Sequence, residues 1–124
     1  MSEADVVKRN DLDERTFKYA QRIIRLFCKL PKSTVAQTLG KQLLRSGTSV
    51  GANYSEAVKA RSKAEFISIL GICLRELNES LYWLRLLKAE DIFQQSQLSP
   101  LIKETNELIS IFTTISKRTK TSTK

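Results

Sequence analysis

The stretch SKAEFISILGICLRELNESLYWLRLL, residues 62–87, decides the fold of this chain. It opens with Ser62 and, three residues later, Glu65, a pairing that marks the start of a helix. Apolar residues then recur at helical spacing on nearly every side, whereas an ordinary surface helix needs only one such stripe. We therefore expect a long central helix that is covered both by its own chain and by further copies of it.

One of the apolar stripes on this helix has no obvious cover within a chain of 124 residues. It consists of Ile72, Trp83 and Leu86, with Glu76 and Glu79 between them. Large apolar patches on a protein surface usually mark contacts with other molecules. We expect a homo-oligomer in which Ile72, Trp83 and Leu86 form the interface between copies.

The composition favours a single all-α domain. Of the 124 residues, 41% are hydrophobic, and only four glycines and two prolines are available for turns. The apolar periodicity predicts helices over residues 12–30, 34–59, 63–89 and 100–117, the last starting at Ser99-Pro100. Short connections between long helices predict an antiparallel up-and-down four-helix bundle. We expect a flexible lead over residues 1–11, the bundle over 12–117 and a basic flexible tail over 118–124.

Two glycines one turn apart, Gly47 and Gly51, interrupt the second predicted helix. Each costs about 1 kcal/mol in a helix interior relative to alanine. They indicate either a close approach of a neighbouring helix or a local kink.

Several classes of function are poorly supported by the composition. The sequence contains no histidine, which removes the usual general base near neutral pH and the commonest metal ligand. Cys28 and Cys73 lie among apolar residues and are expected to be buried, reduced thiols. We expect no enzymatic activity, no metal and no cofactor. With no signal peptide and no apolar run of membrane-spanning length, a cytoplasmic protein without membrane contact is expected.

Glu76 and Glu79 are the strongest candidates for chemistry, because carboxylates in apolar surroundings have raised pKa values. Paired glutamates also bind metals in bundles, but those sites use a Glu-x-x-His motif that this chain lacks. An ion pair with Arg75, Arg85 or a cation of a neighbouring copy is the favoured interpretation. The polar residues expected to be structural are Asn53, Glu56, Ser62, Glu65, Glu76 and Glu79.

The excess of basic residues points to anionic partners. Twenty-one Lys and Arg against 13 Asp and Glu give a net charge of +8. The candidates for contact with nucleic-acid phosphates are Lys41, Arg45, Lys59, Arg61, Lys63, Lys117, Arg118 and Lys120. Few aromatic residues are interleaved with them, so stacking on bases is not indicated. A solvated basic surface explains the same residues equally well.

The segment SGTSVGANYSEAVKARSKAEFISILGICLRELNESLYWLRLL, residues 46–87, resembles the bacterial four helix bundle protein family, also called the 23S rRNA intervening-sequence protein family. The resemblance is carried by an N-x-x-E element, an R-S-x-x-E-F element, an E-x-x-E element and a Trp-Leu pair. Their residues here are Asn53 and Glu56; Arg61, Ser62, Glu65 and Phe66; Glu76 and Glu79; Trp83 and Leu84.

The resemblance implies a homopentamer of four-helix protomers around a central channel. It also implies a distant relation to the accessory proteins of diversity-generating retroelements, which contact nucleic acid and a reverse transcriptase. Members of the family have no agreed biochemical activity.

Two functions fit the sequence. The first is a non-enzymatic homo-oligomeric scaffold that binds RNA or DNA through backbone phosphates. The alternative is a protein–protein interaction module for a separately encoded partner, such as a reverse-transcriptase-like protein, without direct nucleic-acid binding.

Overall fold

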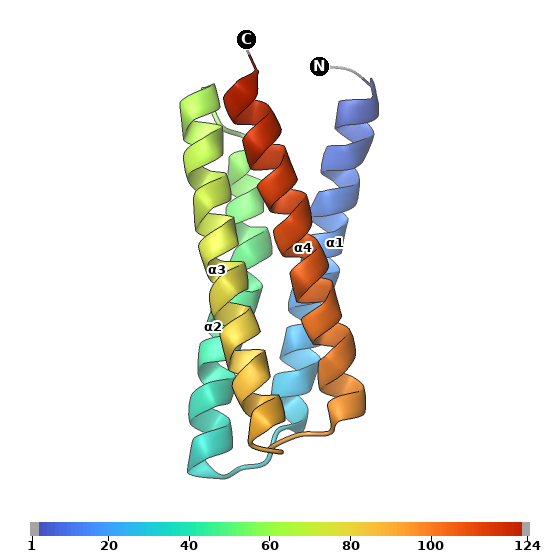
Figure 1. The fold of residues 1–124 in the computed structure, drawn as a ribbon, viewed down its shortest axis with the longest axis vertical. Coiled ribbons are helices and arrows are strands. Elements are labelled where there is room, and N and C mark those ends of the chain that lie inside the picture. Colours follow the sequence, from blue (N-terminus) through green and yellow to red (C-terminus); the bar gives the residue numbers. More distant parts are fainter. Residues whose placement is uncertain (1–2, 123–124) are drawn as a thin grey trace.

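The computed structural model describes residues 3–122, with side chains from residue 11 onward. Within these residues there are four helices and no strand: α1 (Glu3–Lys29), α2 (Thr34–Ala57), α3 (Lys63–Ala89) and α4 (Gln95–Thr121). Consecutive helices run in opposite directions, and the start of α1 lies at the same end of the bundle as the end of α4 (Figure 1). The predicted all-α, up-and-down arrangement of four helices is confirmed. No helix in the described range has the length and hydropathy of a membrane-spanning segment.

A continuous apolar core fills the space between the helices. In it the rings of Tyr54 and Phe112 meet edge to face at 5.6 Å, which ties α2 to α4. Burying one leucine or phenylalanine side chain stabilises a fold by about 1.5–3 kcal/mol. The fully buried large side chains come from all four helices: Tyr19, Ile23, Leu43, Val50, Tyr54, Leu70, Leu77, Leu84, Leu87, Leu98, Leu108 and Phe112.

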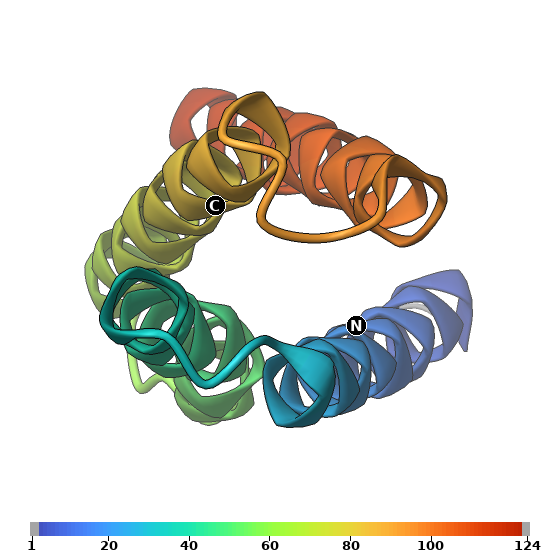
Figure 2. The same ribbon diagram turned by 90° about the horizontal axis from the view of Figure 1, so that it is seen from below.

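The four helices are not equally close to one another. Helix α1 packs against α2, α2 against α3 and α3 against α4, while α1 and α4 pack less closely than these three pairs. The end-on view shows the helices arranged as a C whose open side lies between α1 and α4 (Figure 2). Polar side chains join the two helices across this side, and we call it the α1–α4 seam.

Helix α2 approaches α1 closely through its glycines. A Cβ at Gly47 would lie 2.8 Å from Cγ1 of the buried Ile23. A Cβ at Gly51 would lie 3.2 Å from Thr16 Oγ1, and one at Gly40 only 2.5 Å from a methyl carbon of Leu30. The glycines therefore mark a close approach of two helices.

The predicted bounds are wrong at the start of the first helix and at both ends of the last helix. Helix α1 begins at Glu3 instead of residue 12, in keeping with the lack of proline and glycine before Pro31. Helix α4 begins at Gln95, with Pro100 inside it. Leu98, which is fully buried, anchors this additional turn against the core, and its burial offsets the backbone hydrogen bond that proline cannot donate.

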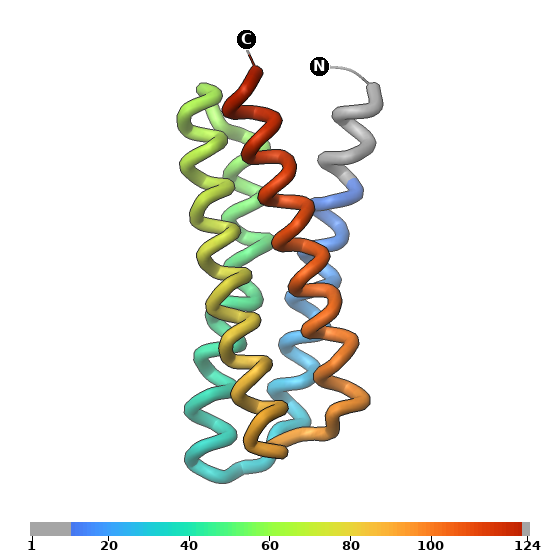
Figure 3. Tube along the Cα trace, in the orientation of Figure 1, coloured from blue at the N-terminus to red at the C-terminus, as the bar shows by residue number. Residues whose placement is uncertain are grey.

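At its other end α4 extends to Thr121, beyond the predicted end at residue 117. The tube view follows the same path, with the residues of uncertain placement in grey (Figure 3). The expected flexibility of residues 1–11 and 118–124 stays a prediction. Residues 1–2 and 123–124 lie outside the described residues.

Replacement of Gly47 by alanine should lower the free energy of unfolding by about 1–3 kcal/mol, because the new methyl group overpacks against the branched side chain of Ile23. Gly71 is the matched control, since it is exposed and a Cβ there meets nothing within 4 Å. Gly71→Ala should raise the free energy by about 0.5–1 kcal/mol. Urea denaturation measures both, and equal effects of the two variants would contradict the close approach.

Candidate functional site

Six of the predicted phosphate-contacting residues come together at one end of the bundle. Lys59 and Arg61 lie in the α2–α3 connection and Lys63 begins α3, while Lys117, Arg118 and Lys120 lie in the last turns of α4. Figure 1 shows this connection and the end of α4 at the same end. The Lys63 ammonium group donates a hydrogen bond to the Ser122 carbonyl and so joins the two groups. We call these six residues the basic end.

The cations of the basic end have little internal compensation. None of the six makes an ion pair within the described part of the chain. Glu65 is nearby, but its carboxylate accepts a hydrogen bond from the Arg61 backbone N–H at 3.4 Å. Ser62 caps α3 as predicted, since its hydroxyl accepts from the Glu65 backbone N–H at 3.1 Å.

Lys41 and Arg45 do not belong to the basic end, because they lie in the first half of α2, toward the opposite end of the bundle. Arg45 is also occupied. Its Nη1 lies 3.2 Å from Glu76 Oε2, and its Nη2 lies 2.7 Å from Glu79 Oε1. The predicted ion pair of Glu76 and Glu79 is confirmed, but the expected partners were wrong. The two carboxylates face α2, whereas Arg75 and Arg85 are exposed elsewhere on α3.

This arrangement provides a structural role for Glu76 and Glu79. The Glu76 side chain is only 9% exposed, and the guanidinium group of Arg45 supplies the opposite charge that a buried carboxylate requires. In the described residues no group of three or more acidic, cysteine or histidine side chains is placed to hold a metal ion.

The serines of α2 and α3 make one contact that the sequence did not reveal. The Ser80 hydroxyl lies 2.8 Å from the Ser46 hydroxyl and joins the two helices inside the core. Asn53 instead donates to the Ser49 carbonyl of its own helix at 2.8 Å. Glu56 is exposed. A signal was present in the sequence, since Ser80 lies at helical spacing between Leu77 and Leu84 and so on the buried face of its helix.

The α1–α4 seam contains a second ion pair. Arg15 donates two hydrogen bonds to Glu104, at 2.8 and 2.7 Å, and a third to Glu107 at 3.1 Å. The hydrogen bond to Glu104 raises the pKa of the Arg15 guanidinium group. Beside them the Tyr19 hydroxyl lies 2.6 Å from Thr105 Oγ1, which itself donates to the Leu101 carbonyl at 2.7 Å. Sequence reasoning missed all of these residues.

One to two turns further along the seam lies a pocket of about 250 Å³. Arg22, Arg25 and Lys29 of α1 line one side of it, and Gln97 and Pro100 of α4 line the other. We call it the cationic pocket. The spacing of the three cations puts them on one face of a helix. This spacing is visible in the sequence and could have indicated a cationic site.

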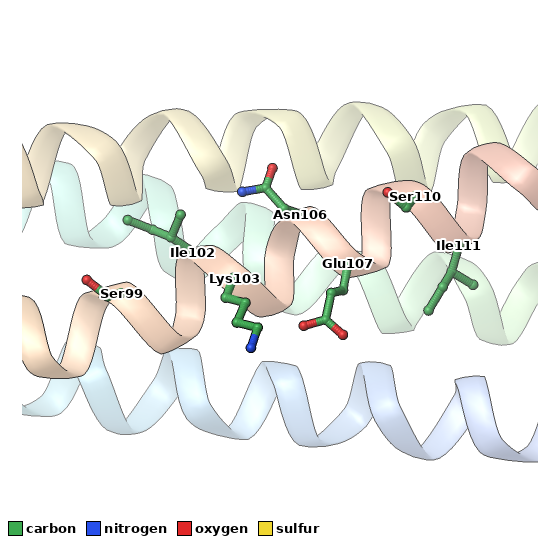
Figure 4. Close-up of a pocket in the computed structure, with 7 residues that line it drawn as sticks. All are labelled: Ser99, Ile102, Lys103, Asn106, Glu107, Ser110 and Ile111. Carbon is green, nitrogen blue, oxygen red and sulfur yellow. The ribbon is translucent and has the colours of Figure 1, made fainter.

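A hollow of about 800 Å³ is an open surface on α4 alone and not an enclosed site. Ile102 and Asn106 project toward α3, while Lys103 and Glu107 project toward α1 (Figure 4). Glu107 already bonds Arg15. No convergence of polar groups marks this surface as a binding site.

The predicted interface residues Ile72, Trp83 and Leu86 are each half-buried within the protomer. Their role in an interface between copies stays a prediction. The Trp83 indole N–H is buried without a hydrogen-bond partner among the described residues. The most exposed large apolar side chains are Phe17, Ile24, Val35 and Tyr82.

The two cysteines also differ from each other in burial. Cys28 is exposed on α1, so its expected burial is wrong, whereas Cys73 is buried as expected. Both are free thiols. Burial raises the pKa of Cys73 to about 12.

Burial raises the pKa of Tyr19 from 10.0 to about 12. The unfolded chain therefore loses this proton first, and the free energy of unfolding should fall by about 2–3 kcal/mol as pH rises from 10 to 12. In Tyr19→Phe the part of this fall in the free energy of unfolding that comes from Tyr19 should be absent, whereas Cys73→Ser should keep that part. Urea denaturation at both ends of this pH range tests the expectation, and identical declines in wild type and Tyr19→Phe would refute it.

The comparisons with known proteins agree with the resemblance seen in the sequence. Residues 8–114 match the family described as 23S rRNA-intervening sequence protein. A crystal structure from Bacteroides thetaiotaomicron, described as a protein of unknown function from the S23 ribosomal protein family, is 36% identical with a TM-score of 0.82. The match covers 89% of this chain and 98% of that one. No curated protein matches. With a family match over most of its length, this chain belongs to the 23S rRNA-intervening sequence protein family.

Proposed function

We propose that the chain is a non-enzymatic homo-oligomeric scaffold that binds RNA or DNA through backbone phosphates at the basic end. The observation that carries the proposal is the convergence of six cations that form no ion pair with any described side chain, from two segments more than 50 residues apart in the sequence. Phosphate contacts of lysine and arginine release counterions and provide affinity without sequence specificity.

The surroundings of these cations favour contact with the backbone over contact with bases. Phe66, the aromatic residue closest in sequence to the α2–α3 cations, packs against the core and is not free to stack on a base. Recognition of single strands usually needs such an aromatic platform. Histidine, the commonest catalytic base, is absent from the sequence, and this supports a binding role over an enzymatic one.

Assembly would strengthen phosphate binding. We propose an interface formed by Ile72, Trp83 and Leu86, which lie on the flank of α3 that also carries Glu76 and Glu79 and which the protomer leaves partly exposed. In a cyclic assembly, copies packed side by side would present all their basic ends on one rim. Several weak phosphate contacts on one rim act together on a long anionic chain. The family resemblance implies five copies.

Removal of the α4 cations by Lys117→Gln, Arg118→Gln and Lys120→Gln should weaken nucleic-acid binding at least tenfold. The slope of log affinity against log salt should also fall by about 2–3, one unit per lost contact. The matched control is the triple variant Arg75→Gln, Arg85→Gln and Lys103→Gln, which removes the same charge from exposed sites elsewhere on α3 and α4. Filter binding with structured RNA and duplex DNA at two salt concentrations gives both quantities.

Equal losses in the two triple variants would mean that only the net charge matters and would refute the basic end as a site. Absence of binding to either nucleic acid at low salt would remove the proposal altogether.

The assembly should have a mass that is a multiple of the 14.1 kDa protomer in light scattering. Ile72→Glu with Leu86→Glu should reduce it to the protomer, because a charge cannot be buried in an apolar interface without a partner. Phe17→Glu with Ile24→Glu is the matched control on α1 and should leave the mass unchanged. A wild-type protein of 14.1 kDa at micromolar concentration would contradict the proposed assembly.

The alternative, a protein-interaction module, is favoured by one observation. Phe17 and Ile24 lie two turns apart on α1 and are 64% and 44% exposed. Such apolar side chains suit a protein partner, for example a separately encoded reverse-transcriptase-like protein. Capture of one partner that survives nuclease treatment and is lost with Phe17→Glu would favour this alternative.

A further inference from the structure

We propose that the cationic pocket between α1 and α4 is a binding site for a phosphate group. It lies near the α1–α2 and α3–α4 connections, at the opposite end of the bundle from the basic end (Figure 1). The proposal is independent of nucleic-acid binding at the basic end, since the two sites share no residue.

The pocket concentrates positive charge that the protein leaves unbalanced. Arg22, Arg25 and Lys29 follow one another at spacings of three and four on α1, where like charges repel. None of the three forms an ion pair among the described residues. Facing them across the pocket, α4 supplies only the neutral Gln97 and Pro100.

The stretch of the seam around Arg15 has a different balance of charge. There the cation of α1, Arg15, meets two carboxylates of α4, with Glu104 bound by two hydrogen bonds. Glu104 is thereby occupied, so it is not free to balance the charge of Arg22. The seam thus contains a stretch in which two carboxylates meet one cation, followed by a stretch of cations alone, and an anion from solution would be the partner of the second.

The pocket also has the shape and polarity that a phosphate group requires. Leu26 and Leu101, each 4% exposed, form the apolar part of the lining, while Arg25, Lys29 and Gln97 are exposed and accessible to an anion from solution. Arginine guanidinium groups bind phosphate oxygens in pairs, and the Gln97 amide adds a further donor. A volume of about 250 Å³ is below that of most sites for drug-sized ligands, which suits one phosphate group with the rest of its molecule in solvent.

The test is calorimetric titration of the full chain with inorganic phosphate, with sodium chloride at equal ionic strength as the blank. We expect saturable binding that Arg22→Gln with Arg25→Gln weakens at least tenfold. Arg75→Gln with Arg85→Gln, the matched pair of exposed arginines on α3, should leave it unchanged, as should the triple variant of the α4 cations at the basic end. Circular dichroism checks that each variant is folded, and Arg22→Lys with Arg25→Lys should retain part of the affinity.

A nucleoside 5′-monophosphate in a second titration identifies the source of the phosphate. Tighter binding than inorganic phosphate, lost in the same arginine variant, would point to a phosphorylated metabolite or nucleic-acid end. Equal affinity, again dependent on Arg22 and Arg25, would mean that the phosphate group alone is recognised. The proposal is overturned if phosphate produces no more heat than chloride, or if its binding survives the loss of both arginines.

Discussion

The rotation of α1 about its own axis determines which surfaces this protein presents, and the contact with α2 sets that rotation. Ile23 and Thr16 fit against Gly47 and Gly51, which have no side chain to hold α1 away. With that face fixed, Tyr19 points into the core and Arg15 faces α4. Phe17 and Ile24 are left on the outside. A different rotation would bury a cation or expose Tyr19, so the tight glycine contact underlies both the seam and the pocket.

The net charge of +8 becomes informative only once the internal ion pairs are known. Arg45 is held by Glu76 and Glu79, and Arg15 by Glu104 and Glu107. These pairs lie along the middle of the helices and hold neighbouring helices together. Among the described residues, cations without such partners gather at the two ends of the bundle, in the basic end and in the cationic pocket, while Arg75, Arg85 and Lys103 lie separately along its sides. Binding of anions is therefore expected where the cations gather, at the ends.

Features that depend on local periodicity could be predicted from the sequence. Features that depend on contacts between helices could not. The capping by Ser62 and the bounds of α3 follow from residues a few positions apart, and both are as predicted. The partner of Glu76 could not be found in this way, because Arg45 is 31 positions away and only the packing of α2 on α3 brings it close. Cys28 was misjudged because burial was inferred from its apolar neighbours in the sequence, whereas the packing of α1 leaves it on the exposed side of the helix.

The loose contact between α1 and α4 leaves room for a ligand in the seam. In the core, apolar side chains fill the space between the helices, and a ligand there would have to displace part of the core. Along the seam the helices are joined by the hydrogen bonds of Arg15 and Tyr19, which leave room beside them. An anion in the cationic pocket would contact both helices and add a third link across this open side. Phosphate binding and closure of the bundle would then stabilise each other, since whatever binds only the folded form raises its stability.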